Sequence, residues 1–184
     1  VTAAYGSGFG DNSIRGILQT AVTAANISVF DRSQRDPDLR GMGTTIVACI
    51  VCDGIAHIVH AGDSRAYHIT AEGIEQMTKD HSVVQLLVDR GEITQDEARF
   101  HPKKHFITRA LGVMSIIDLD YCEFALDEGE AIIICTDGLS NYFTSGELFD
   151  MVKAAGYGKC VDKLINAAKK AGGADNITVV CISK

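Results

Sequence analysis

Two hairpin patterns between positions 44 and 78 constrain the fold more than any other feature of the sequence. The first places the turn pair Asp53-Gly54 between two apolar, β-branched segments, and the second places Glu72-Gly73 between two more. Turns this short join antiparallel strands, because a parallel connection needs about a dozen residues or more. We therefore expect antiparallel pairing rather than repeated βαβ units. The four strands are predicted at residues 44–52, 55–60, 65–70 and 74–78.

Helical periodicity precedes and follows the hairpins. After Ser13, which suits the N-cap position, apolar residues recur every three or four positions, and the pattern predicts one amphipathic helix over 13–33. Strands followed by helices and then by a returning strand favour an α+β fold over a parallel α/β fold. Further strands are expected at 106–111, 119–126, 131–135 and 177–182, and further helices near 83–91, 94–98, 144–155 and 159–171.

Length and charge exclude several classes of protein. The 184 residues predict a single domain, 1–184, that is long enough to fold without disulfides. The net charge of −7 argues against nucleic acid and against an anionic membrane as partners, because both require a basic surface. No apolar run reaches the roughly 18 residues that a membrane span needs.

Six cysteines indicate a reducing compartment. Most of them lie inside apolar runs, where a free thiol behaves as a small buried hydrophobe. Cys49 and Cys52 form a Cys-x-x-Cys pair, but residues three apart on a strand face opposite sides of the sheet. No second such pair completes a zinc site. We interpret the cysteines as core residues, with metal or redox roles as the alternative, and expect a cytoplasmic protein.

Three aspartates stand where apolar strands end beside glycine-bearing turns. They are Asp63, Asp137 and Asp175. The ends of strands can bring carboxylates from distant parts of the chain to one edge of a sheet, and clustered carboxylates bind hard divalent cations such as Mg²⁺ or Mn²⁺. Each aspartate taken alone also suits a turn, since Asp favours hairpin turns and helix caps. The three residues by themselves leave both interpretations open.

The order of six short motifs favours the metal interpretation. They are Gly-Met-Gly-Thr-Thr at 41–45, Gly-Asp-Ser-Arg-Ala-Tyr at 62–67, Asp-His-Ser at 80–82, Ile-Thr-Arg-Ala-Leu-Gly at 107–112, Cys-Thr-Asp-Gly-Leu at 135–139 and Gly-Ala-Asp-Asn-Ile-Thr at 173–178. Together these motifs resemble the metal-dependent serine/threonine protein phosphatases of type 2C, the PPM family, in its bacterial form. Each motif alone would be weak evidence, whereas six in the family's order form a specific pattern.

The resemblance implies a fold and a chemistry. The fold is a four-layer α-β-β-α sandwich of two antiparallel sheets flanked by helices, with residues 79–105 as a flap subdomain. The chemistry is hydrolysis of phosphoserine and phosphothreonine in proteins by a water held between two Mn²⁺ or Mg²⁺ ions, because a divalent metal lowers the pKa of bound water. A phosphoprotein substrate and a cognate Ser/Thr kinase are the implied partners.

The resemblance also assigns the aspartates, residue by residue. Asp137 and Asp175 match ligands of the two-metal core. Asp63 matches the other protein ligand of a third, weaker metal that Asp137 shares. Gly138 and Asn176 match supporting positions in the same two motifs. No catalytic residue is implied beyond the metal ligands.

Two arginines and three histidines lie within or near these motifs. Arg65 and Arg109 have the chemistry to contact phosphate, but we favour structural ion pairs for both. Histidine as a residue type can exchange a proton near neutral pH, which makes His81, His101 and His105 general-acid candidates. We expect an ordinary surface or hydrogen-bonding role for each, because titration alone does not place a histidine at the phosphate.

The chain departs from the family pattern before its first long helix. It contains neither the family's Arg-x-x-Asn-Glu-Asp segment nor its Asp-Gly-x-Gly-Gly segment, and the glycine-rich stretch 4–11, which ends at Asp11, does not replace them. In the family these segments supply a phosphate-binding arginine and an aspartate that bridges the two core metals. We therefore expect an N-terminally incomplete domain, either a fragment or a natural form.

Three functional expectations follow from this departure. The chain itself should be weakly active or inactive as a phosphatase. A sheet edge left without its neighbouring strand should be exposed and is a possible site of dimerisation. The alternative function is a non-catalytic regulatory or binding module of the same fold, and an enzyme of the related sporulation and stress-response type would differ in its substrate.

Overall fold

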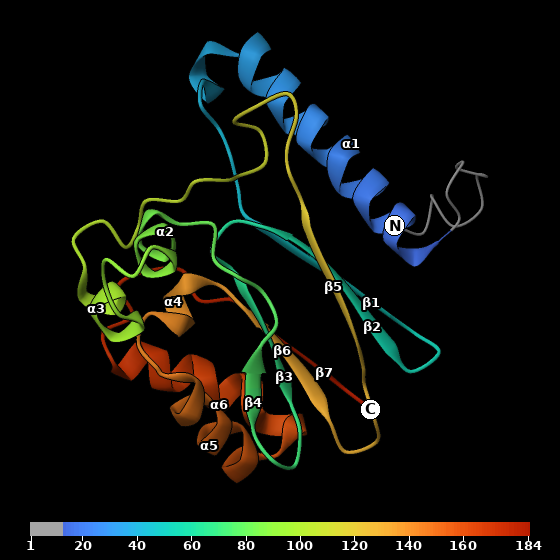
Figure 1. Cartoon of the computed structure of the whole chain (residues 1–184), viewed down its shortest axis with the longest axis vertical. Coiled ribbons are helices and arrows are strands. Elements are labelled where there is room, and N and C mark those ends of the chain that lie inside the picture. Colours follow the sequence, from blue (N-terminus) through green and yellow to red (C-terminus); the bar gives the residue numbers. More distant parts are fainter. Residues whose placement is uncertain (1–12) are drawn as a thin grey trace. The chain divides into compact units, whose positions relative to one another are not determined.

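The computed structural model describes residues 13–184, and these form two compact units (Figure 1). The first unit holds the described residues up to Gly62 together with His81–Ala125. The second unit holds Asp63–Asp80 together with Leu126–Lys184. The glycine-rich stretch 4–11, including Asp11, lies outside the described residues.

A three-stranded antiparallel sheet and one long helix form most of the first unit (Figure 1). The helix begins at Ser13 as predicted, because the Ser13 side chain accepts a hydrogen bond from the Gly16 amide at 3.0 Å. Leu18 and Val22 on its apolar face share a buried cluster with Val59 of the sheet. The elements are α1 (Ile14–Arg35), the 3-10 turn η1 (Pro37–Leu39), β1 (Ile46–Cys52), β2 (Ile55–Ala61) and β5 (Asp120–Ala125), in the sheet order β1-β2-β5.

A four-stranded antiparallel sheet and two helices form the second unit. Tyr67 and Ile133 of the sheet and Leu148 of a helix belong to one buried cluster. That helix starts with a capping box, in which the side chains of Thr144 and Glu147 each accept a hydrogen bond from the other residue's amide. The elements are β3 (Arg65–Ile69), β4 (Ile74–Gln76), β6 (Ala131–Cys135), α4 (Asp137–Ser140), α5 (Ser145–Ala155), α6 (Tyr157–Lys170) and β7 (Val179–Ser183), in the sheet order β4-β3-β6-β7.

The remainder of the first unit contains two short helices, α2 (Val83–Asp89) and α3 (Gln95–Phe100), close to their predicted positions. The strand predicted at 106–111 is wrong. This segment makes only two isolated bridges, one between Ser82 and Ile107 and one between Thr44 and Leu111. It has apolar and β-branched residues, but no strand among residues 13–184 runs beside it, and Phe106 is 61% exposed.

The α+β class, with two antiparallel sheets flanked by helices, is confirmed. The two predicted hairpins enter different sheets, because β3 pairs with the distant β6 rather than with β2. The cysteines are free thiols, with Cys135 and Cys160 buried. Among the described residues, no helix combines the length and apolar character that a membrane crossing requires. The single-domain span 1–184 and the flap at 79–105 stay predictions.

Candidate metal site

The register of the second sheet brings Asp63 and Asp137 close together. β3 and β6 pair antiparallel, with Arg65 opposite Cys135. Asp63 precedes the first residue of β3 by two positions and Asp137 follows the last residue of β6 by two, so both stand at the same end of the sheet. Both side chains are half-buried. Burial raises the pKa of Asp63 to about 6, and the negative charges of Asp137 and Asp80 add to the increase.

Asp137 is also held close to the turn that carries Asp175. The amide of Thr136 donates to the Thr178 carbonyl at 3.2 Å, and the amide of Thr178 donates to the Thr136 hydroxyl at 3.0 Å. That hydroxyl donates in turn to the Asn176 carbonyl at 3.2 Å. These bonds bring together the loop after β6 and the loop before β7.

Gly138 permits this approach because it has no side chain. A Cβ atom at this position would lie 2.2 Å from the carbonyl oxygen of Asn176, far inside van der Waals contact. The sequence predicts that Gly138 and Asn176 support the metal site, and the close approach of their backbones is a physical way in which they could do so. The Asn176 side chain is exposed, and the backbone N–H of Asn176 donates to the Asp175 carboxylate at 2.7 Å.

The three predicted ligands are not gathered equally. Asp63 and Asp137 influence each other electrostatically, whereas Asp175 is exposed and no contact joins its carboxylate to the other two within the described part of the chain. Sequence analysis missed Asn141, whose side-chain amide donates to the Asp137 carboxylate at 3.1 Å across one turn of α4. The spacing of four residues between an acid and an amide was the available signal.

The donor chemistry fits a hard divalent cation. The negative charge of Asp137 helps to raise the pKa of the half-buried Asp63, and a cation that binds between or beside the two carboxylates removes this repulsion. Carboxylate and carbonyl oxygens are the ligands that Mg²⁺ and Mn²⁺ accept most readily. Asp63, Asp137 and Asp175 therefore suit such an ion by ligand type.

Arg65 forms a structural ion pair, as predicted. Its guanidinium donates to the Asp80 carboxylate through Nε at 2.9 Å and through Nη2 at 2.7 Å, and through Nη1 to the Tyr67 hydroxyl at 3.2 Å. Burial alone would lower the pKa of Arg65, but the bonds to Asp80 hold it above its ordinary value. The guanidinium of Arg65 is therefore bonded to the Asp80 carboxylate rather than available to bind a phosphate.

A second cluster of potential ligands lies in the first unit and contains His60, His81 and Asp120. Their donor atoms lie within 4.8 Å of one another, the single such set of three in the described residues. The two imidazole rings stack with centroids 4.7 Å apart. The His81 Nδ1 accepts a hydrogen bond from the Gly62 amide at 3.1 Å, so the ring's proton is on Nε2, 3.1 Å from an Asp120 oxygen.

Arg109 identifies this second cluster as a hydrogen-bond network. Its guanidinium lies 2.7 Å from Asp120 and 3.1 Å from the His81 Nε2. A metal at this point would have to displace the Nε2 proton and lie beside a fixed positive charge. Burial raises the pKa of Asp120, but hydrogen bonds from His81 and Arg109 outweigh it and lower the pKa overall. The ion pair predicted for Arg109 and the hydrogen-bonding role predicted for His81 are both confirmed.

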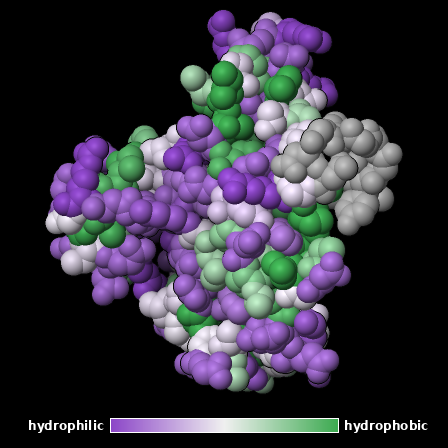
Figure 2. Space-filling model, turned by 45° about the vertical axis from the view of Figure 1, so that its right-hand side comes forward, coloured by the Kyte–Doolittle hydropathy of each residue, from purple (hydrophilic) through white to green (hydrophobic). Residues whose placement is uncertain are grey.

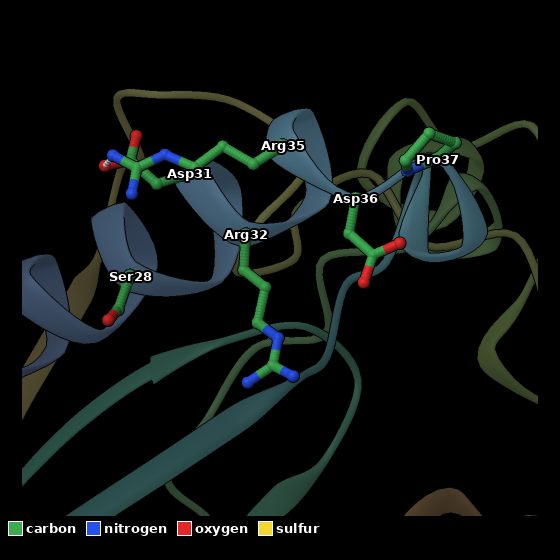
Figure 3. Close-up of a pocket in the computed structure, with 6 residues that line it drawn as sticks. All are labelled: Ser28, Asp31, Arg32, Arg35, Asp36 and Pro37. Carbon is green, nitrogen blue, oxygen red and sulfur yellow. Dashed lines mark hydrogen bonds and ion pairs between the residues drawn. The ribbon is translucent and has the colours of Figure 1, made fainter.

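A hollow of about 500 Å³ lies at the end of α1, and none of the three aspartates of the candidate site lines it (Figure 3). Its lining charges compensate one another, because Asp31 pairs with Arg35 at 3.4 Å, and both side chains are exposed. Figure 3 shows these two side chains directed toward each other, whereas Arg32 extends separately. The hollow offers no convergent set of buried polar groups and is not the chemical site.

Comparisons with known proteins show the family to which the chain belongs. The family model for protein phosphatase 2C matches residues 6–177. The serine/threonine phosphatase stp of Listeria monocytogenes is 34% identical over 168 residues, which cover 91% of this chain and 67% of that protein. The chain thus spans about two thirds of the length of this relative.

Solved structures share the fold. The serine/threonine phosphatase Stp1 from Staphylococcus aureus superposes with a TM-score of 0.90 at 29% identity, over 97% of this chain and 70% of that one. The catalytic domain of the phosphatase PstP, solved in complex with two manganese ions, superposes with a TM-score of 0.84 at 32% identity, over 98% and 76% of the two chains. With its family model, its relatives and its fold in agreement, the chain belongs to the protein phosphatase 2C family of serine/threonine phosphatases.

Proposed function

We propose that this chain carries the greater part of a metal-dependent site for hydrolysis of phosphoserine and phosphothreonine in proteins. The observation that carries the proposal is the electrostatic influence of Asp137 on Asp63, two carboxylates that stand just beyond the paired ends of β6 and β3. Bound divalent ions such as Mn²⁺ or Mg²⁺ would supply an activated water and stabilise the charge on the phosphoryl group. The two manganese ions in the PstP structure support this choice of metal.

The residues of the chain hold and orient this site. Asp63, Asp137 and Asp175 supply the carboxylates. Asn141 fixes one oxygen of Asp137 and leaves the other free to face an ion. Gly138 keeps the loop of Asp137 against the loop of Asp175.

We also propose that the 184-residue chain by itself has little or no phosphatase activity. Its sequence lacks the Arg-x-x-Asn-Glu-Asp and Asp-Gly-x-Gly-Gly segments. The resemblance assigns the phosphate-binding arginine and the bridging aspartate to these segments. The ion pairs already made by Arg65 and Arg109 support the proposal, since neither guanidinium is available as a replacement.

We extend the proposal to the cellular location, the partners and the oligomeric state of the protein. Free thiols at all six cysteines support a reducing, cytoplasmic location, and the family supports a phosphoprotein substrate with a cognate kinase. In the described sheets β1, β5, β4 and β7 are edge strands, and pairing between edges of two copies would produce the dimer that the sequence suggested.

Calorimetry with Mn²⁺ and turnover of p-nitrophenyl phosphate test the proposal together. We expect weak Mn²⁺ binding, lost in Asp137→Asn, and turnover close to background. Asp162→Asn is the matched control, because Asp162 is an exposed carboxylate on α6. Robust turnover that Asp137→Asn abolishes would contradict the low-activity proposal. Absence of Mn²⁺ binding would favour the alternative, a non-catalytic binding module.

A further inference from the structure

Gly62 and His81 form two reciprocal hydrogen bonds. The Gly62 amide donates to the His81 Nδ1 at 3.1 Å, and the His81 amide donates to the Gly62 carbonyl at 2.9 Å. One residue therefore satisfies both the donor and the acceptor of Gly62. Gly62 immediately precedes Asp63, so these bonds fix the backbone from which the Asp63 side chain departs.

The backbone conformation of Gly62 and its contact with Thr45 also restrict its position. Its φ angle of +116° lies in the region that favours glycine. A Cβ atom there would lie 2.4 Å from the Thr45 Cγ2. The residue is buried, with Thr45 packed against it and His81 bonded to it. The Gly62 backbone thus has one well-defined position, and the hydrogen bonds to His81 select it.

The His81 ring contacts His60, Asp120 and Gly62, and these contacts fix its orientation. It is 7% exposed and stacks on His60, which is 3% exposed, with an angle of 9° between the rings. Its Nε2 proton faces Asp120, and Arg109 holds Asp120 in place. This arrangement keeps the lone pair on Nδ1, where the Gly62 amide needs an acceptor.

Asp80, the residue before His81, contacts the chain just after Asp63. Asp80 binds the guanidinium of Arg65, two residues after Asp63. The pair Asp80-His81 therefore contacts the chain both just before and just after the predicted metal ligand. Each contact lies within its own compact unit.

We infer that His81 is a positioning residue for Asp63, which acts through the Gly62 backbone to set the direction in which the Asp63 carboxylate meets a metal ion. The inference rests on the proposed function, because it takes Asp63 as a metal ligand. His81 touches neither substrate nor metal in this scheme. The atom that acts on Gly62 is the Nδ1 acceptor of His81. The Nε2 donor of the same ring faces Asp120 instead.

Two substitutions separate these two atoms. His81→Asn places an amide oxygen near the position of Nδ1 and removes the group that faces Asp120. His81→Gln places its amide near the position of Nε2 and removes the acceptor for Gly62. Both variants lose the stack on His60, so that loss cancels in the comparison. The readouts are hydrogen exchange of the Gly62 amide in metal-free protein, measured by NMR, and Mn²⁺ affinity, measured by calorimetry.

We expect His81→Gln to lose the protection of the Gly62 amide and to bind Mn²⁺ about tenfold more weakly, the usual effect of removing a group that orients a ligand. His81→Asn should keep Gly62 protected and bind Mn²⁺ as the wild type does. Equal behaviour of the two variants in both readouts would overturn the inference. If the wild type bound no Mn²⁺, the proposed function would fail, and the Gly62 exchange rates of the two variants would still decide whether His81 holds this backbone.

Discussion

Replacing Gly138 with alanine should separate the two loops that carry Asp137 and Asp175. The added Cβ would lie 2.2 Å from the Asn176 carbonyl oxygen and 3.0 Å from its carbonyl carbon. Nonbonded carbon contacts are comfortable at about 3.5 Å. Because the obstructing atoms belong to the backbone, no side-chain rotation relieves the clash, and one loop must move by about an ångström.

The cost of that movement follows from the hydrogen bonds between the loops. Three bonds, at 3.2, 3.0 and 3.2 Å, join Thr136 to Thr178 and Asn176. Each contributes about 1 kcal/mol, and overpacking in other proteins costs about 1–3 kcal/mol. The better helix propensity of alanine in α4 returns up to about 1 kcal/mol. The free energy of unfolding should therefore fall by about 2–3 kcal/mol, which lowers Tm by roughly 4–12 °C in a chain of this size.

Thermal unfolding of the metal-free protein, followed by circular dichroism, measures this loss. Gly146→Ala is the matched control, because Gly146 also lies in a helix but a Cβ there meets no atom within 4 Å. That control should be as stable as the wild type or more so, by up to about 1 kcal/mol. If Gly138→Ala melted together with Gly146→Ala, the close approach of the Gly138 and Asn176 backbones would not constrain the site, and the reasoning would be refuted. Mn²⁺ affinity of Gly138→Ala should fall in parallel with its stability.

Two further substitutions test the electrostatics of the same unit. Asp63→Asn should stabilise the metal-free protein near neutral pH and should weaken Mn²⁺ binding. The pKa of Asp63 in the folded protein, about 6, exceeds its ordinary value of 3.8. The wild type therefore loses stability as the pH rises through this interval, and the variant does not. Melting curves at pH 4 and pH 7.5 check this, and a difference in Tm that does not grow with pH would count against it. Asp80→Asn should cost about 3 kcal/mol in urea unfolding, because it leaves the largely buried Arg65 without its counter-charge. The exposed pair of Asp31 and Arg35 supplies the control, Asp31→Asn, and a loss at Asp80 as small as at this control would show the Arg65 pair to be an ordinary surface one.

Several apolar side chains of the first unit are exposed. Phe100 and Ile116 are each 83% exposed, and Met114 is 66% exposed. On the face shown in Figure 2, hydrophobic residues form separate patches within a largely hydrophilic surface. Scattered exposure of this kind is normal for a folded protein.

Local chemistry was enough to predict the elements that depend on neighbours in sequence. Ser13 and Thr144 begin their helices because a hydroxyl beside a free amide needs no distant partner. The turn pair at Asp53-Gly54 joins its strands because the required positive φ angles occur within the pair itself. The same local patterns placed the aspartates at the ends of strands.

Only the tertiary structure decided which of these elements meet. Periodicity shows which face of a strand is apolar, but not which strand lies beside it. The segment 106–111 therefore looked like a strand but, within the described residues, pairs only at two isolated bridges, whereas β3 pairs with β6 across more than sixty intervening positions of sequence. That pairing brings the chain positions of Asp63 and Asp137 to the same end of the sheet. Likewise, the hydrogen bonds between Gly62 and His81 arise because the chain returns after the hairpin of β3 and β4, a contact that no local pattern specifies.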